Sequence, residues 1–253
     1  MTLSLFAIQM LNGLQLGVLL FMMSAGLTLV FGIMNFVNLA HGSLYMMGAY
    51  FAAWAYGQTN SALRAGLAGV ARRALLGLVV ERVVAARLYG RDHLDQVLAT
   101  FGLILFFNEI VRWIWGPSPV YMNVPEALSG AIPILGINYP AYRFVIILVG
   151  LGVALGSYLL INKTRVGMLI RAGSSNPTIV AALGVNIKLL NAAIFALGTA
   201  MAGLAGLMSG PILSVQPGMG EPILILAMIV IVIGGIGSVR GAFYSALIVG
   251  VID

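Results

Sequence analysis

Apolar residues follow one another in long runs along almost the whole chain. The runs over about residues 8–34, 94–115, 142–161 and 189–213 are each long enough to cross a hydrocarbon layer of ~30 Å as a helix. Strands of a membrane barrel would instead alternate apolar and polar positions. The pattern therefore predicts an all-α protein, a polytopic bundle of transmembrane helices.

Four further apolar runs are shorter or interrupted. They cover about residues 37–56, 62–86, 222–233 and 242–253. Together with the longer runs they predict about eight spans, all within a single transmembrane domain that covers residues 1–253.

The run at 62–86 is unusual because Arg64, Arg72 and Arg73 fall inside it. An arginine at the centre of a span costs ~2.5–3.5 kcal/mol on insertion scales. These side chains would have to reach the membrane surface, face the protein interior or be stabilised by neighbouring helices. No functional role follows from them.

Composition supports the membrane assignment. The chain is 61% hydrophobic and only 8% charged, whereas soluble domains carry about a quarter charged residues. The net charge of +6 is explained by basic loops on one side of a membrane, so it does not indicate a nucleic-acid partner. The absence of cysteine from the sequence excludes disulfides and thiolate metal sites.

The distribution of basic residues predicts the orientation. The loops at 87–93 and 162–188 are basic, whereas the loops at 57–61, 116–140 and 214–221 contain no lysine or arginine. Basic loops stay in the cytoplasm. We therefore expect the amino terminus and the three uncharged or acidic loops outside.

The loop at 162–188 is the longest polar interruption of the apolar pattern. Three candidate capping residues at 174–176 precede Pro177, which suits a first helical turn. Residues 178–183 then predict a short apolar helix that ends at Gly184. A basic loop with a small helix is either a topological anchor or a socket for a soluble partner.

Two polar breaks, at about 35–43 and 234–241, interrupt the apolar runs. The first is either a tight cytoplasmic turn or a discontinuous helix beside a water-filled path, and matched breaks in two halves of a chain indicate a transport pathway. For any single polar residue, interhelical hydrogen bonding is the competing explanation. The candidate pathway residues are Asn12, Gln15, Asn35, Asn38, His41, Gly235, Gly237 and Ser238.

The sequence contains no recognisable catalytic or metal-binding constellation. A phosphate-binding loop would need glycines before Lys163, but Ser157 and Asn162 stand there. The two histidines, His41 and His93, lie in different loops and in no metal-binding motif. We therefore expect neither enzyme activity nor a metal site.

Three long stretches, at 12–50, 88–119 and 209–243, resemble the inner-membrane permeases of bacterial ABC importers for branched-chain amino acids. The chain departs from the family at 62–75, where the family has an uninterrupted apolar span. The resemblance also predicts a further span beyond Asp253, so that the carboxyl end is expected to be truncated.

The resemblance implies a division of labour in the bacterial inner membrane. A periplasmic binding protein captures leucine, isoleucine or valine, and this chain forms the pathway with a second permease subunit, surrounded by lipid. Two cytoplasmic ATPase subunits bind the ATP, so this chain needs no cofactor. The resemblance also implies an ATPase-coupling loop, which consists of Arg171, Ser174, Ser175, Asn176, Pro177, Ala181, Ala182, Gly184 and Asn186.

Two alternatives remain open from the sequence. One is a permease of the same family for another solute, such as urea or a short amide. The other is a self-sufficient channel or secondary carrier, which would move solute without partner proteins.

Overall fold

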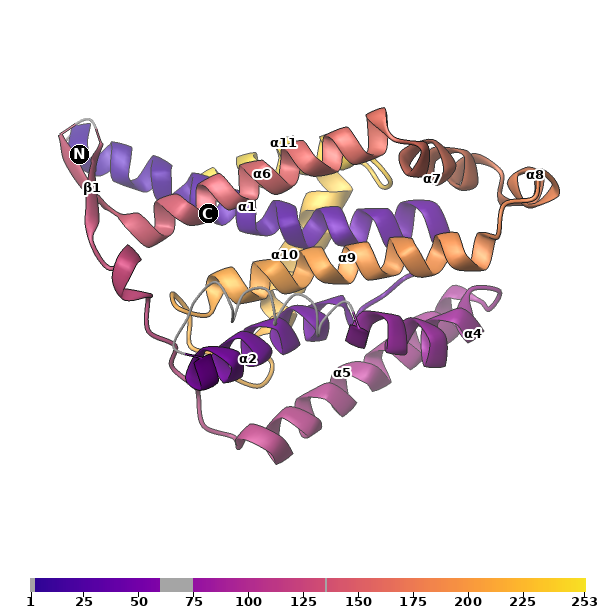
Figure 1. The fold of residues 1–253 in the computed structure, drawn as a ribbon, viewed down its shortest axis with the longest axis horizontal. Helices are drawn as coiled ribbons and strands as arrows, with labels where there is room; N and C mark the ends of the chain where they lie inside the picture. Colours follow the sequence, from indigo (N-terminus) through magenta and orange to yellow (C-terminus); the bar gives the residue numbers. More distant parts are fainter. Residues whose placement is uncertain (1–2, 60–74, 135) are drawn as a thin grey trace.

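The computed structural model describes residues 3–59, 75–134 and 136–253, most of which are helical (Figure 1). Helices α1 (Leu3–Met34), α6 (Ala141–Lys163) and α9 (Ile187–Ser209) run along the long axis of the molecule. Helix α5 (His93–Trp115) lies obliquely below them, next to α2 (His41–Thr59). The predicted helical bundle is confirmed.

Four described helices are long and apolar enough to span a membrane, over Ser4–Gly32, His93–Trp115, Ala141–Lys163 and Ile187–Ser209. Helices α10 (Gly220–Gly234) and α11 (Val239–Ile252) form a pair that is bent by 120° at a short break. If this pair is counted as one span, the total rises to five. The expected count of eight is therefore not confirmed. Residues 62–74 of the expected span at 62–86, including its three arginines, lie outside the described residues.

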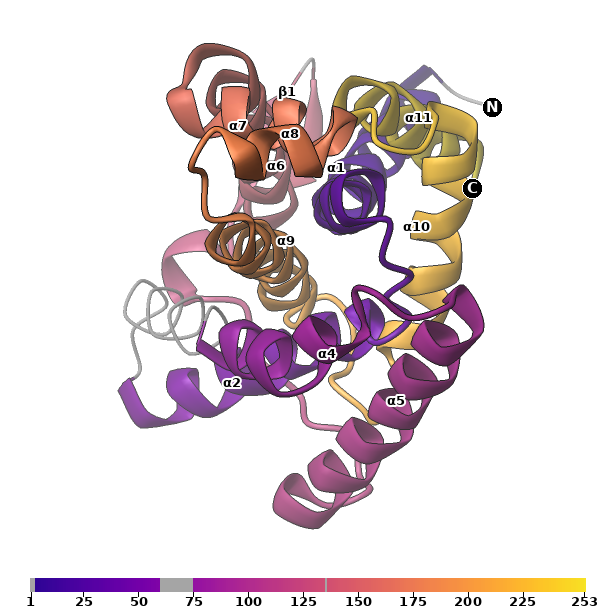
Figure 2. The same cartoon turned by 90° about the vertical axis from the view of Figure 1, so that its right-hand side faces the viewer.

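Helix α1 is the centre of the bundle. In its most apolar window 78% of the residues are buried, compared with 17% in α6. Figure 2 shows α1 between α9 and the pair α10 and α11. Small residues permit this close packing: a Cβ added at Gly13 would lie 2.7 Å from the carbonyl oxygen of Gly250, and one added at Gly198 would lie 2.8 Å from that of Gly26.

The first polar break separates α1 from α2. Asn35 has a positive φ of 48°, and α2 begins only at His41. The side chain of Gln96 holds the break: its carbonyl accepts a hydrogen bond from the Val37 amide at 3.0 Å. The expected discontinuity near 35–43 is confirmed, and Gln96 ties it to the start of α5.

The start of α2 lies against the interior of the bundle. His41 is fully buried, and Gly42 faces the backbone of Gly220 at the start of α10. A Cβ added at Gly42 would lie 2.5 Å from the Gly220 carbonyl oxygen. The end of the first break therefore packs against α10 inside the protein.

Residues 75–80 are helical and lead into a π-helical turn, η1 (Glu81–Ala85), and α4 (Ala86–Leu88). The carboxylate of Glu81 is buried and accepts a hydrogen bond of 3.0 Å from the Tyr89 hydroxyl. Burial, helped by the nearby Glu81 charge, raises the pKa of Tyr89, so its hydroxyl stays protonated and can donate.

The loop after α5 folds at the end of the molecule that also holds the amino terminus (Figure 1). It contains a 3₁₀ turn, η2 (Glu126–Leu128), and an antiparallel hairpin of β1 (Ala131–Ile134) and β2 (Ile137–Pro140). Helices α7 (Arg165–Ser175) and α8 (Pro177–Ala182) lie at the opposite end. This arrangement agrees with the orientation expected from the charges.

Candidate functional site

The basic segment between α6 and α9 forms two helices. Thr164 caps α7 by accepting a hydrogen bond from the Gly167 amide at 3.1 Å, and Asn176 caps α8 by accepting one from the Ile179 amide at 3.0 Å. Pro177 occupies the first turn of α8. The predicted short helix is confirmed, whereas α7 was not predicted.

Gly184 ends α8 with a positive φ of 86°. Its amide donates to the Ala181 carbonyl at 3.0 Å, and the Val185 amide donates to the Val180 carbonyl at 3.3 Å. Asn186 then caps α9 by accepting from the Leu189 amide at 3.1 Å. A Cβ on Gly184 would meet nothing within 4 Å, so the backbone conformation is what requires glycine here.

Helix α8 projects beyond the ends of α6 and α9 (Figures 1 and 2). Val180 is buried and anchors it, while the side chains of Ile179 and Leu183 are 58% and 78% exposed. Ala181 and Ala182 are exposed as well. The helix thus presents an apolar tip outside the bundle, a feature typical of a protein-binding surface.

Helix α7 connects this tip to the bundle. Ile170 is buried in the core, and Arg171 donates a hydrogen bond to the Ile161 carbonyl at the end of α6. The hydroxyl of Ser174 donates to the Gly32 carbonyl of α1 at 3.1 Å. A displacement of α7 would therefore act on both α6 and α1.

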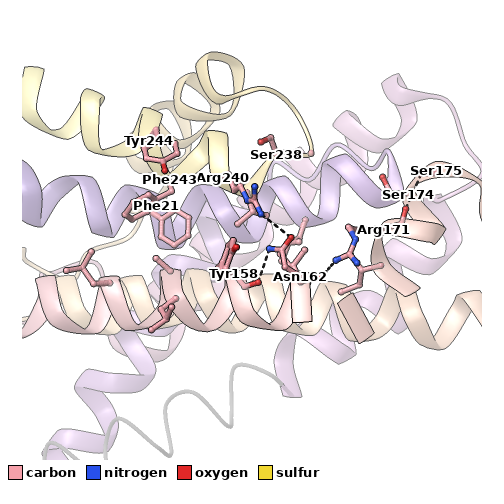
Figure 3. Close-up of a pocket in the computed structure, with 18 residues that line it drawn as sticks. Phe21, Tyr158, Asn162, Arg171, Ser174, Ser175, Ser238, Arg240, Phe243 and Tyr244 are labelled. Carbon is pink, nitrogen blue, oxygen red and sulfur yellow. Dashed lines mark hydrogen bonds between the residues drawn. The ribbon is translucent and has the colours of Figure 1, made fainter. Parts of the chain in front are cut away.

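A cavity of about 910 Å³ lies between α1, α6, α7 and α11. Figure 3 shows that Arg171, Ser174 and Ser175 line one end, while Phe21, Phe243 and Tyr244 line the other. Residues of the second break also line this cavity. The predicted residues that the structure brings together here are Arg171, Ser174 and Ser175 of the coupling loop and Gly237 and Ser238 of the second break.

Arg240 links α11 to α6 across this cavity. Its guanidinium lies 5.0 Å from the ring centroid of Tyr158 and donates a hydrogen bond of 3.4 Å to the side-chain oxygen of Asn162 (Figure 3). Ser238 caps α11 by accepting from the Gly241 amide at 3.0 Å. Sequence reasoning placed Arg240 in the second break but did not select it, although its charge in a glycine-rich break was the available signal.

The remaining predicted pathway residues lie elsewhere. Asn12, near the opposite end of α1, accepts hydrogen bonds from Arg143 at 2.7 Å and from the Tyr139 hydroxyl at 3.3 Å. Gln15 is buried one turn further along α1. Neither of these two side chains lines the large cavity.

The residues of the first break also occupy separate surroundings. Asn35 is exposed at the end of α1 and His41 is fully buried. Asn38 lines a small pocket of about 40 Å³ whose other lining residues are apolar. Gly235 is exposed directly after the end of α10. The eight predicted pathway residues thus do not form one continuous site within this chain.

A metal centre has no support in the described part of the chain. No group of three or more histidine, cysteine, aspartate or glutamate side chains gathers there. The large cavity is lined by hydrogen-bonding groups, two arginine side chains and apolar residues.

A multi-pass bundle with a broken helix pair and a short helix that projects from a basic segment has the architecture of a membrane transport subunit. A family described as "Branched-chain amino acid transport system / permease component" matches residues 9–253, and the chain belongs to this family.

Named relatives agree with this assignment. The high-affinity branched-chain amino acid transport system permease protein BraD of Pseudomonas aeruginosa is 28% identical to this chain. Their alignment has a length of 260 residues, gaps included, and covers 97% of this chain and 84% of BraD. The corresponding protein LivH of Salmonella typhimurium is 29% identical in an alignment of 261 residues that covers 98% of this chain and 85% of LivH.

A relative named for another solute is also similar. The ribose import permease protein RbsC of Escherichia coli is 27% identical over 243 residues, which cover 91% of this chain and 72% of RbsC. No solved structure matches the chain.

Proposed function

We propose that this chain is a permease subunit of an ABC importer that moves leucine, isoleucine and valine across the bacterial inner membrane into the cytoplasm. Its partners are a second permease subunit, a periplasmic amino-acid-binding protein and two cytoplasmic ATPase subunits, which bind and hydrolyse the ATP. The chain itself supplies no catalytic residue. The family match over residues 9–253 is the observation that carries this proposal.

The coupling step is assigned to α7 and α8. The apolar tip formed by Ile179 and Leu183 docks in a cleft of the ATPase, and the closing of the ATPase pushes on α8. Because α7 is bonded to the ends of α6 and α1 through Arg171 and Ser174, the push moves both helices. Packed helices respond to such a push by switching between discrete arrangements.

The solute path is assigned to the face where the two breaks meet the second permease subunit. Groups freed from helical hydrogen bonding near 35–40 and at 235–236, which lie outside the large cavity, would bind the zwitterionic head of the amino acid, while apolar helix faces accommodate the branched side chain. This assignment is consistent with breaks that lie in the interior and at the cytoplasmic end of the bundle.

Reconstitution in liposomes tests the proposal. With partner permease, ATPases, binding protein and ATP, we expect uptake of radiolabelled leucine that isoleucine and valine compete and that urea and ribose do not. Competition by urea or ribose alone would identify a different solute. Leucine flux through liposomes that contain this subunit alone would instead identify a channel or secondary carrier.

A substitution at the tip of α8 tests the coupling role. Leu183→Asp places a charge on a docking surface, so we expect uptake to fall by at least ~10-fold, the effect typical of a central interface residue. Tyr121→Asp is the matched control, because Tyr121 is 80% exposed but lies on the opposite side of the molecule. Equal uptake by the two variants would contradict ATPase docking at α8.

A further inference from the structure

We propose that the cavity between α1, α6, α7 and α11 binds an anionic phospholipid of the cytoplasmic leaflet, with the phosphate at its cationic end and an acyl chain along its aromatic end. This role is separate from solute transport. It depends on the proposed orientation, in which α7 faces the cytoplasm, but not on the identity of the solute.

The cationic part of the cavity has two arginines from different helices. Arg171 comes from α7 and lies at one end of the cavity, and Arg240 comes from α11 and lies between Arg171 and the aromatic residues; both side chains are exposed (Figure 3). Arg171 uses one nitrogen on the Ile161 carbonyl, and Arg240 uses one on Asn162. A guanidinium has five N–H donors, so several remain to bind phosphate oxygens.

Other groups at this end also favour an anion. The amino terminus of α11, capped by Ser238, opens at the cavity and carries partial positive charge from its unpaired amides. None of the described residues that line the cavity is acidic. Charge complementarity therefore selects an anionic head group.

The rest of the cavity is suited to a hydrocarbon chain. Phe21 and Phe243 form its inner wall; their rings pack edge to face, with the ring centroids 5.2 Å apart. Its outer rim is apolar and open: Leu155 is 60% exposed and Tyr244 66% exposed. Since α6 and α11 are membrane-embedded in this account, an acyl chain enters sideways from the bilayer.

An amino-acid solute fits this cavity less well. A zwitterion needs a partner for its ammonium group as well as for its carboxylate, and the lining offers two cations without an acid. A basic pocket between transmembrane helices at the cytoplasmic side is instead typical of sites for anionic lipid head groups.

Native mass spectrometry of the full chain purified in detergent tests this proposal. Phosphatidylglycerol and phosphatidylcholine are added in equal amounts, and the fraction of protein that retains each lipid is measured from the masses of the complexes. We expect phosphatidylglycerol to be retained at least ~10-fold better, and the double variant R171Q/R240Q to lower this preference roughly 10- to 30-fold. Because both side chains are exposed, the variant should remain folded, which its melting temperature checks.

The matched control is K163Q/R165Q. It removes the same amount of charge, from the basic segment that also holds Arg171, but neither residue lines the cavity, so we expect the lipid preference to change less than ~3-fold. An equal loss in both double variants would show general surface attraction and overturn the proposal.

Two further outcomes would also overturn it. Displacement of the lipid by millimolar inorganic phosphate would identify a site for free phosphate, and displacement by leucine would identify a solute site. Failure of the liposome uptake experiment leaves the lipid preference unaffected, so the two proposals fail separately.

Discussion

At Gly198 the bundle leaves no room for a side chain. An added Cβ would lie 2.8 Å from the Gly26 carbonyl oxygen and 3.3 Å from a methyl of Val30. The nearest atom belongs to the backbone of α1, so relief requires the helices to separate. Close helix packing through small residues is thus what holds α1 and α9 together.

We expect Gly198→Ala to lower stability by about 1–3 kcal/mol through overpacking. Gly152→Ala on α6 is the control: nothing lies within 4 Å of its added Cβ, and alanine in an open helical position should gain ~0.5–1 kcal/mol. Melting in detergent measures both. A Gly198 variant that melts with or above the Gly152 variant would contradict the packing account.

The side chain of Gln96 ties the first break to α5. It is buried, and besides its bond from the Val37 amide it donates to the carbonyls of Leu88 and Arg91 at 3.3 and 3.1 Å. Removing it leaves the half-buried amide of Val37 without its partner, which costs about 1–3 kcal/mol.

Gln96→Leu should therefore accelerate hydrogen–deuterium exchange in the segment 35–40 by roughly 5- to 160-fold, the factor that corresponds to this loss. Gln9→Leu, at an exposed position of α1, is the control and should leave exchange there unchanged. Identical exchange in both variants would mean that the break is held by other contacts.

At the scale of elements, the connection between α8 and α9 depends on one backbone conformation. Gly184 has a φ of 86°, which a β-branched residue adopts only with strain of about 1–3 kcal/mol. In Gly184→Val we expect normal membrane insertion but leucine uptake several-fold lower relative to ATP hydrolysis, because α8 is held in another orientation. Gly184→Asn, which tolerates this conformation, should retain coupling. Equal coupling in the valine and asparagine variants would argue against this role.

Elements were predicted from the sequence where local signals are strong. Long apolar runs predicted α5, α6 and α9 to within a few residues, and the Asn176 cap with Pro177 predicted α8. Helix α7 was missed because glycine, serine and arginine make its sequence resemble a loop. The β-hairpin was missed because Pro133 and Pro140 suggested irregular structure.

The site was less predictable than the elements. The cavity joins residues near 154–175 to residues near 237–244, and periodicity does not determine which membrane helices become neighbours. Lipid-exposed and protein-facing sides are both apolar, so the hydrophobic pattern that orients helices in soluble proteins carries little information here.

At the scale of the whole molecule, the two ends carry different elements. One end carries the amino terminus and the β-hairpin, and the other carries α7, α8 and the second break (Figure 1). Helices α5 and α6 leave most of their apolar windows unburied, with only 22% and 17% buried, so lipid or the proposed second permease subunit covers them. The proposed coupling requires the end that carries α7 and α8 to face the cytoplasm.

Because the sequence has no cysteine, single-cysteine labelling measures this orientation directly. Thr178→Cys reports on α8 and Tyr121→Cys on the loop before the hairpin; both positions are exposed. With a membrane-impermeant maleimide, we predict that spheroplasts label only the Tyr121 variant and inside-out vesicles only the Thr178 variant. Labelling of the Thr178 variant in spheroplasts, with the Tyr121 variant protected, would contradict ATPase docking at α8.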